Sequence, residues 1–185
     1  MGHGGDVIAE LTTDHREVDE LFEQLDNALP GSERRKQLAD ALTIELVRHS
    51  VAEEQYLYPA VREHLDGGDA IADREIADHA RVEALLKELE GRDADDTDFD
   101  RLVRELRTEV TAHVADEEHN LFPQLREGAH GYVLESLGEK IREAKKTAPT
   151  RPHPSTPDNP AISKLLAPGL GLADRARDYV TGRGQ

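Results

Sequence analysis

Residues 49–63 read HSVAEEQYLYPAVRE and residues 113–127 read HVADEEHNLFPQLRE, so the two stretches align without a gap. The same offset of 64 residues aligns Asp14-His15 with Asp78-His79 and several apolar positions with one another. These apolar pairs are Val18 and Val82, Leu21 and Leu85, Leu25 and Leu89, Leu38 and Leu102, and Leu42 and Leu106. One offset held over so long a span indicates that the chain contains two copies of one structural unit.

Glycine and proline residues divide this region into four long segments that lack strand-like alternation and are rich in Ala, Leu, Glu and Arg. They span residues 6–29, 33–66, 70–90 and 98–127, and a shorter segment spans 131–146. Steps of three and four residues, typical of a bundle seam, separate Ile8, Leu11, His15, Val18, Phe22, Leu25 and Leu29. We predict an all-α fold: an antiparallel up-down four-helix bundle built from two tandem helical hairpins, followed by a short fifth helix.

The composition of the chain changes near Thr147. Residues 1–147 carry 18 basic and 36 acidic side chains, a net charge of −18, whereas residues 148–185 carry five and three, a net charge of +2. Six of the nine prolines fall between Pro149 and Pro168. We therefore expect residues 1–147 to form the bundle and residues 148–185 to form a proline-rich, extended and flexible tail, in which LADRARDYV could form a short helix.

Charge and composition exclude several classes of function. With 23 basic and 39 acidic residues, the net charge of −16 argues against binding to nucleic acids or to anionic membranes. The absence of cysteine excludes disulfides, thiolate zinc sites and iron–sulfur ligation. No run of 18 apolar residues could span a membrane, and the start, MGHGGDVIAE, does not resemble a signal peptide. We expect a cytoplasmic protein.

Imidazole and carboxylate side chains recur four residues apart along the predicted helices. Positions four apart differ by about 40° around a helix and therefore share a face. The histidines lie on the same stripes as the leucines, so we expect them to point inward. The pairs are His49 and Glu53, His79 and Glu83, and His113 and Glu117, with His15 and the shorter Asp19 in the first segment.

Such inward carboxylates need positive neighbours. An ionised carboxylate in a bundle interior costs on the order of several kcal/mol, and no lysine or arginine lies on these stripes near the histidines. A cation bound by the same groups removes this cost, so we predict a metal site rather than a set of neutral core histidines. The predicted ligands are His15, His49, Glu53, His79, Glu83, His113 and Glu117.

Four further residues lie close to the predicted site. Asp19 is either a ligand or a hydrogen-bond partner. Glu45 and Glu109 each precede a histidine by one turn and either orient its ring N–H group or face solvent. Tyr56 lies one turn beyond the first of the two glutamates and either donates a hydrogen bond to a bound oxygen species or packs in the core.

Glu118 competes with its neighbour Glu117. On an ideal helix Glu118 lies about 140° from His113, so Glu117 is the better candidate ligand. A kink at Pro123 could still turn Glu118 inward, because proline breaks the local hydrogen-bond ladder.

The donor set restricts the metal. Nitrogen and oxygen donors without sulfur suit iron, manganese or zinc. Calcium and magnesium prefer shells of oxygen alone, so four imidazoles argue against them. Four histidines with three or four carboxylates exceed one coordination shell, which indicates two metal ions.

The pattern of His15, His49-x-x-x-Glu53, His79 and His113-x-x-x-Glu117, with LYP and LFP after each Glu-Glu pair, resembles the hemerythrin-like (HHE cation-binding) family over residues 6–127. The resemblance implies a four-helix bundle that holds two non-haem irons on these six residues, with Glu53 and Glu117 bridging. Oxygen-carrying hemerythrins have a second histidine where this chain has Glu83, and an aspartate where it has Glu118.

The resemblance implies a di-iron protein, with an oxo or hydroxo bridge, that handles dioxygen or hydrogen peroxide, with catalase-like turnover and a role in oxidative stress. The alternative is an iron, oxygen or redox sensor, or an iron-handling regulatory protein, without turnover. Negative charge from Glu83 would favour ferric iron. We therefore expect a site that oxidises readily rather than one that carries oxygen reversibly. The sequence identifies no protein partner for the tail.

Overall fold

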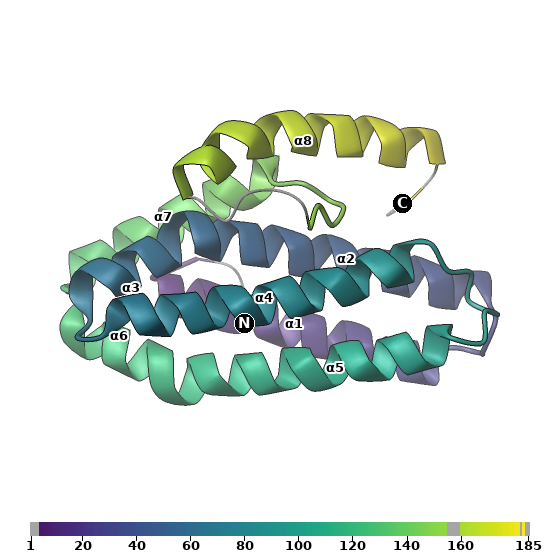
Figure 1. Ribbon diagram of the computed structural model, residues 1–185, viewed down its shortest axis with the longest axis horizontal. Coiled ribbons are helices and arrows are strands. Elements are labelled where there is room, and N and C mark those ends of the chain that lie inside the picture. The colour runs from purple at the N-terminus through teal and green to yellow at the C-terminus, as the bar shows by residue number, and fades with distance from the viewer. Residues whose placement is uncertain (1–3, 155–159, 182, 184–185) are drawn as a thin grey trace.

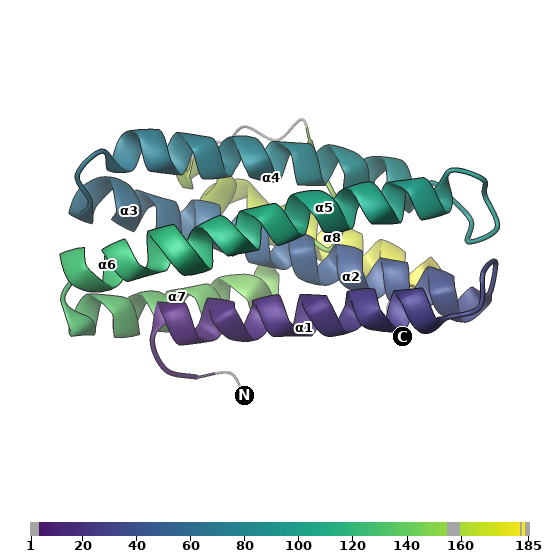
Figure 2. The same ribbon diagram turned by 90° about the horizontal axis from the view of Figure 1, so that it is seen from below.

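The computed structural model describes residues 4–154, 160–181 and 183, and every regular element in these ranges is helical (Figure 1). The first hairpin consists of α1 (Val7–Asn27) and a second run formed by α2 (Glu33–Ala52), the π-helical turn η1 (Glu53–Leu57) and α3 (Tyr58–His64). The second hairpin consists of α4 (Gly68–Glu90) and a run formed by α5 (Phe99–Asp116), η2 (Glu117–Leu121) and α6 (Phe122–Gly128). The hairpins pack side by side as an antiparallel bundle (Figure 2), which confirms the predicted fold class.

Local sequence sets the ends of the first helices. Asp6 caps α1 by accepting a hydrogen bond from the Ala9 N–H at 2.9 Å, and Ser32 caps α2 by accepting one from the Arg35 N–H at 3.2 Å. Gly31 adopts a φ of +71° in the turn between them, a conformation that favours glycine. Because α1 ends at Asn27, Leu29 lies in this turn and is 77% exposed, so its predicted place on the seam was wrong.

The π-helical turns occupy equivalent positions in the two repeats, and each immediately precedes the stretch that contains Pro59 or Pro123. Proline has no N–H to donate to the carbonyl four residues earlier, and its ring clashes with that carbonyl in an α-helix. The helix accommodates this by bonding residues five apart: the N–H of Tyr58 donates to Glu53, and the N–H of Phe122 donates to Glu117. Residues after each turn are thereby shifted by one position around the helix.

Two apolar clusters fill the bundle on either side of the histidine layer. Phe22, Leu42, Leu86 and Leu106 belong to the cluster near the α1–α2 and α4–α5 turns. The other cluster, at the end that contains α3 and α6, includes Leu11, Leu57, Val61, Leu121, Leu125 and Ile141. The polar layer between the clusters is therefore closed off from solvent along the bundle axis.

Helix α7 (Gly131–Thr147) packs against α1 and α2. Its Gly138 permits a close approach, because a Cβ atom there would lie 2.6 Å from the Gly5 carbonyl oxygen. The predicted short fifth helix is thus a third layer on one side of the bundle.

The C-terminal region is helical where an extended tail was expected, and its helix includes the LADRARDYV segment for which a short helix was predicted. It contains α8 (Pro160–Thr181), a 22-residue helix that lies outside the bundle next to α7 and η1 (Figure 1). The backbone N–H groups of Thr150 and Arg151 both donate to Asp174 of α8 at 3.1 Å, and the Arg151 guanidinium contacts Glu90 and Asp178. These buried polar contacts, which the composition does not reveal, fix the segment that leads into the helix.

None of the helices in the described residues combines the length and the apolar run that crossing a bilayer would require.

Candidate metal centre

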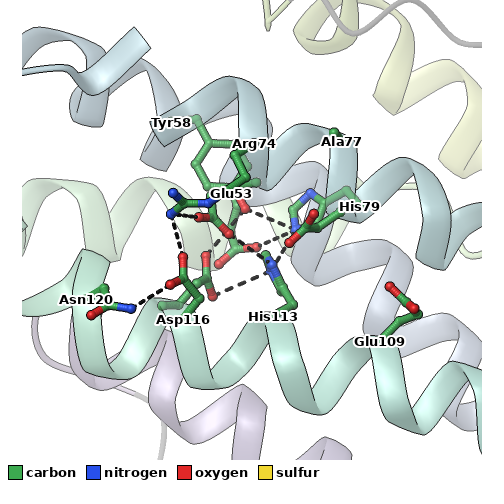
Figure 3. Close-up of polar contacts among 12 residues, drawn as sticks. Glu53, Tyr58, Arg74, Ala77, His79, Glu109, His113, Asp116 and Asn120 are labelled. Atoms are coloured by element: carbon green, nitrogen blue, oxygen red, sulfur yellow. Dashed lines mark hydrogen bonds and ion pairs between the residues drawn. The ribbon is translucent and has the colours of Figure 1, made fainter. Parts of the chain in front are cut away.

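Each of the four bundle helices contributes one buried imidazole to the same layer: His15 from α1, His49 from α2, His79 from α4 and His113 from α5. None of these residues is more than 6% exposed. Their Nε2 atoms face the bundle axis, and those of His79 and His113 are 3.1 Å apart. Figure 3 shows these two rings converging with Glu53 beside Tyr58.

Two fully buried glutamates lie between the imidazoles of different hairpins. Glu53 Oε2 is 3.1 Å from His49 Nε2 and 3.2 Å from His79 Nε2. Glu117 Oε2 is 3.3 Å from His15 Nε2 and 3.7 Å from His113 Nε2. Each carboxylate thus contacts one imidazole from each hairpin.

A second carboxylate lies at the Nδ1 atom of every imidazole. The distances from Nδ1 to carboxylate oxygen are 2.8 Å for His15 and Glu118, 3.1 Å for His49 and Asp14, 3.0 Å for His79 and Glu54, and 3.1 Å for His113 and Glu75. At His15, His49 and His79 this contact is a hydrogen bond, which holds the proton on Nδ1 and leaves the Nε2 lone pair free for a metal. This arrangement is typical of metal-binding histidines.

Unsatisfied polar atoms at the centre indicate that the residues fit a metal. Within the described part of the chain, both oxygens of Glu53, Glu117 Oε2 and His15 Nε2 are buried and lack a hydrogen bond of acceptable geometry. Buried charged groups left in this way are costly unless a cation binds them. Two clusters of potential ligand atoms share Glu53, and within each cluster the atoms lie within 4.8 Å of one another. One cluster comprises His15, His49, Glu53 and Glu117. The other comprises Glu53, His79 and His113.

Without metal, protons take the place of the cation. Burial lowers the pKa of His79, but hydrogen bonds to Glu53 and Glu54 outweigh this effect and raise it to about 10. The pKa of His49 is also raised well above its usual value, against the effect of burial, by Glu53 and Asp14. Burial raises the pKa of Glu53, but His49 and His79 hold it well below its usual range. Metal binding at neutral pH must therefore displace protons from imidazoles.

Tyr58 contributes a phenol to the centre, whereas Tyr56 takes the predicted alternative of packing in the core. The Tyr58 hydroxyl lies 3.0 Å from His79 Nε2 and donates a hydrogen bond to Glu117 at 3.4 Å. Burial, and then the charges of the surrounding glutamates, raise the pKa of Tyr58 well above its usual value, so the metal-free phenol is neutral. Tyr56 is half-buried against an apolar cluster, because the π-helical turn moves the site face on to Tyr58.

Glu83 does not reach the centre, so its prediction as a ligand was wrong. Its carboxylate accepts a hydrogen bond from the His153 N–H at 2.8 Å and thereby binds the C-terminal region. Since α1 and α4 run antiparallel to α2 and α5, a residue that follows His79 lies on the opposite side of the imidazole layer from Glu53. Glu75, which precedes His79, is on the correct side. The expectation of readily oxidised iron depended on Glu83 and loses that support.

The same topology explains the positions of Asp19, Glu45 and Glu109. Asp19 follows its histidine on α1, is 56% exposed and pairs with Arg16 at 3.1 Å. Glu45 pairs with Arg48 at 3.3 Å, and Glu109 pairs with Arg81 at 3.2 Å and lies apart from the cluster in Figure 3. Glu45 and Glu109 therefore take the solvent-facing alternative of the prediction, and the carboxylates at the imidazole Nδ1 atoms are those of Asp14, Glu54, Glu75 and Glu118.

One of these orienting residues could have been found from the repeat. Glu54 aligns with Glu118, and each contacts the first-helix histidine of the other hairpin. The repeat does not identify Asp14 or Glu75 in this way. Asp14 aligns with Asp78, but Asp78 pairs with Arg81 instead of an imidazole. Glu75 aligns with Leu11, which has no carboxylate.

A small cavity of about 20 Å³ adjoins the four imidazoles. Apart from Ser50, the other residues that line it are apolar: Val18, Leu46, Val82, Val110 and Val114. Its volume suits a molecule about as large as water.

Comparisons with known proteins agree with this centre. The family model described as the hemerythrin HHE cation-binding domain matches residues 6–125. An uncharacterised hemerythrin-like protein of Schizosaccharomyces pombe is 25% identical over 90% of this chain and 82% of its own length. A DNA nickase of a Nostoc species is 27% identical over 73% of this chain, which spans only 38% of that protein.

Among solved structures, a hemerythrin HHE cation-binding domain-containing protein of Mycobacterium kansasii superposes with a TM-score of 0.67. It is 25% identical, and the match covers 76% of this chain and 85% of that one. The family model matches most of the chain, and the histidines and glutamates gather in one layer of the bundle. The protein therefore belongs to the hemerythrin family of HHE cation-binding domains.

Proposed function

We propose that this centre holds two iron ions and reacts with dioxygen or hydrogen peroxide. The shared glutamates and the four Nε2 atoms supply donors for two ions, and the set contains no sulfur. Manganese and zinc also accept nitrogen and oxygen donors, and we favour iron over them because of the family resemblance. Bound iron would supply the one-electron chemistry that no side chain in the layer provides.

The cavity beside the imidazoles carries this proposal. At about 20 Å³ it accommodates a molecule of a few atoms and excludes organic substrates. Its valine and leucine walls favour a small apolar molecule such as dioxygen and keep the centre dry. Hydrogen peroxide is the other oxidant of comparable size.

The residues around the centre have separable roles. Glu53 and Glu117 would hold both ions, and the four outer carboxylates orient the imidazoles through Nδ1. The Tyr58 hydroxyl, 3.4 Å from Glu117, can donate a hydrogen bond or exchange a proton within the layer.

Peroxide consumption by the iron-loaded protein tests the proposal. Oxygen release after addition of hydrogen peroxide would be followed with an oxygen electrode, and reaction with dioxygen would be followed from the visible spectrum. Val110→Leu adds one methylene to the cavity wall, so it should slow both reactions while iron content stays at two ions per chain. Iron-loaded protein that reacts with neither oxidant would contradict the proposal.

A sensor without turnover is the second candidate, and contacts between α4 and the C-terminal region favour it. Glu83 and Glu90 lie on the helix that carries His79, and they bind the His153 N–H and the Arg151 side chain. A shift of α4 with metal state would therefore alter the attachment of this region. Limited proteolysis of residues 148–154 that differs between metal-loaded and metal-free protein, without peroxide consumption, would support the sensor.

Peroxide removal would give the protein a role in oxidative stress. That role and the cytoplasmic location remain predictions.

A further inference from the structure

Helix α7 lies outside the residues matched by the family model, yet it contacts the metal centre through a chain of side chains. Lys145 of α7 binds two carboxylates of α1: the ammonium group donates to Asp14 Oδ1 and lies 3.3 Å from Glu10 Oε1. The other oxygen of the same aspartate, Asp14 Oδ2, lies 3.1 Å from His49 Nδ1. Two contacts, Lys145 to Asp14 and Asp14 to His49, thus connect α7 to the imidazole at the centre.

We propose that Lys145 is a positioning residue of the metal centre, which holds Asp14 where its carboxylate orients the His49 ring toward the metal. This inference rests on the metal centre proposed above, but it does not depend on which metal is bound.

Burial makes the interaction specific. The side chain of Lys145 is 15% exposed, and those of Asp14 and His49 are each 7% exposed. Burial lowers the pKa of Lys145, but the charge of Asp14 outweighs it and raises the pKa, so the group stays cationic at neutral pH. A fixed ammonium group on Oδ1 restricts rotation of the carboxylate and directs Oδ2 at the imidazole N–H.

The other orienting carboxylates are supported differently. Glu118 pairs with Arg16 and Glu75 with Arg74, so their cations come from the four bundle helices themselves. Glu54 has no cationic partner among the described residues apart from His79. Lys145 is therefore the cation by which the additional helix acts on the centre.

A purely structural role for Lys145 predicts different behaviour from a positioning role. Arg142 lies on the same face of α7, but its guanidinium binds Glu10 Oε2 at 3.3 Å and the Gly5 carbonyl rather than Asp14. Removal of either cation would loosen the packing of α7 on α1. Removal of Arg142 leaves the contact between Lys145 and Asp14 in place, whereas removal of Lys145 abolishes it, which makes Arg142→Met a matched control.

The test uses zinc as a redox-inert, diamagnetic probe on the full chain. Zinc affinity is measured by chelator competition, and the Nδ1–H signals of the four histidines by NMR of the zinc-loaded protein. Lys145→Met should lower zinc affinity about tenfold or more and accelerate solvent exchange of the His49 Nδ1–H alone. Lys145→Arg should restore both measurements, and Arg142→Met should leave both unchanged even where it lowers unfolding stability.

If Lys145→Met does not fold, Lys145→Gln provides an uncharged donor to Asp14 for the same two measurements. Zinc affinity and a His49 signal that stay at wild-type values in Lys145→Met, or in Lys145→Gln where it replaces that variant, would overturn the inference. An equal loss in Arg142→Met would overturn it too, because the effect would then be one of helix packing. Wild-type protein that binds no zinc would instead contradict the metal centre itself.

Discussion

Removal of the metal should leave a protein that becomes less stable as the pH rises from about 6.5 to about 10. In the metal-free fold the pKa of His79 is raised from 6.5 to about 10, because Glu53 and Glu54 outweigh the effect of burial. The native state then binds more protons than the unfolded chain, so stability is fully present below pH 6.5 and is lost as the pH passes the folded pKa. One pKa unit corresponds to about 1.4 kcal/mol, so His79 alone would contribute at most about 5 kcal/mol.

Other imidazoles of the layer change stability in the same direction. The pKa of His15 is raised by Glu117 and Glu118 against the effect of burial, and the pKa of His49 is raised well above its usual value. Metal-loaded protein should lack this dependence, since its imidazoles are already deprotonated.

Urea denaturation at several pH values, followed by circular dichroism, measures the effect on chelator-treated and metal-loaded protein. A His79→Gln variant in the metal-free state should show a smaller loss of stability over the same range, because it lacks one of the titrating groups. Metal-free stability that is constant, or that rises with pH over this range, would refute the reasoning.

Substitutions at individual residues give further predictions. His49→Ala should lose metal and unfolding stability together, because metal binding contributes to the free energy of folding. Elemental analysis and denaturation measure the two losses. His64→Ala, at the end of α3, should lose neither, and equal losses in the two variants would argue against the site. Glu75→Ala should weaken metal binding about tenfold in chelator competition. Glu83→Ala should leave metal affinity unchanged and speed proteolysis of residues 148–154, because it removes the hydrogen bond from the His153 N–H. Weaker metal binding by this variant would restore Glu83 as a ligand.

The repeat was sufficient to predict the bundle and the inner residues of the centre. A stretch that recurs at one offset places His49 and His113 at equivalent points, and the following glutamates share their faces. Helical periodicity also places His15 among Leu11 and Val18, which are buried in the two apolar clusters. Local spacing is enough for these residues because each contact lies within one turn or one seam.

Contacts that depend on the relative direction of helices were not predictable from spacing alone. Glu83 and Asp19 follow their histidines by four residues, like Glu53, but α4 and α1 run in the opposite direction. The π-helical turn likewise changes which residue faces the centre, so that Tyr58 and not Tyr56 lies beside His79. An ideal α-helix has no such shift.

The C-terminal helix is a third case. Proline-rich composition favours an extended chain, whereas Asp174 and Asp178 lie one turn apart on α8 and bind Thr150 and Arg151. These partners are more than 20 residues apart in sequence, so composition alone does not reveal the pairing.

Anomalous diffraction at the iron edge, from crystals grown with excess Fe²⁺, tests the metal centre most directly. The account predicts two iron peaks in the layer of His15, His49, His79 and His113, each bound by Nε2 atoms and both contacted by Glu53 and Glu117. A layer that holds only water or protonated side chains under these conditions would contradict it.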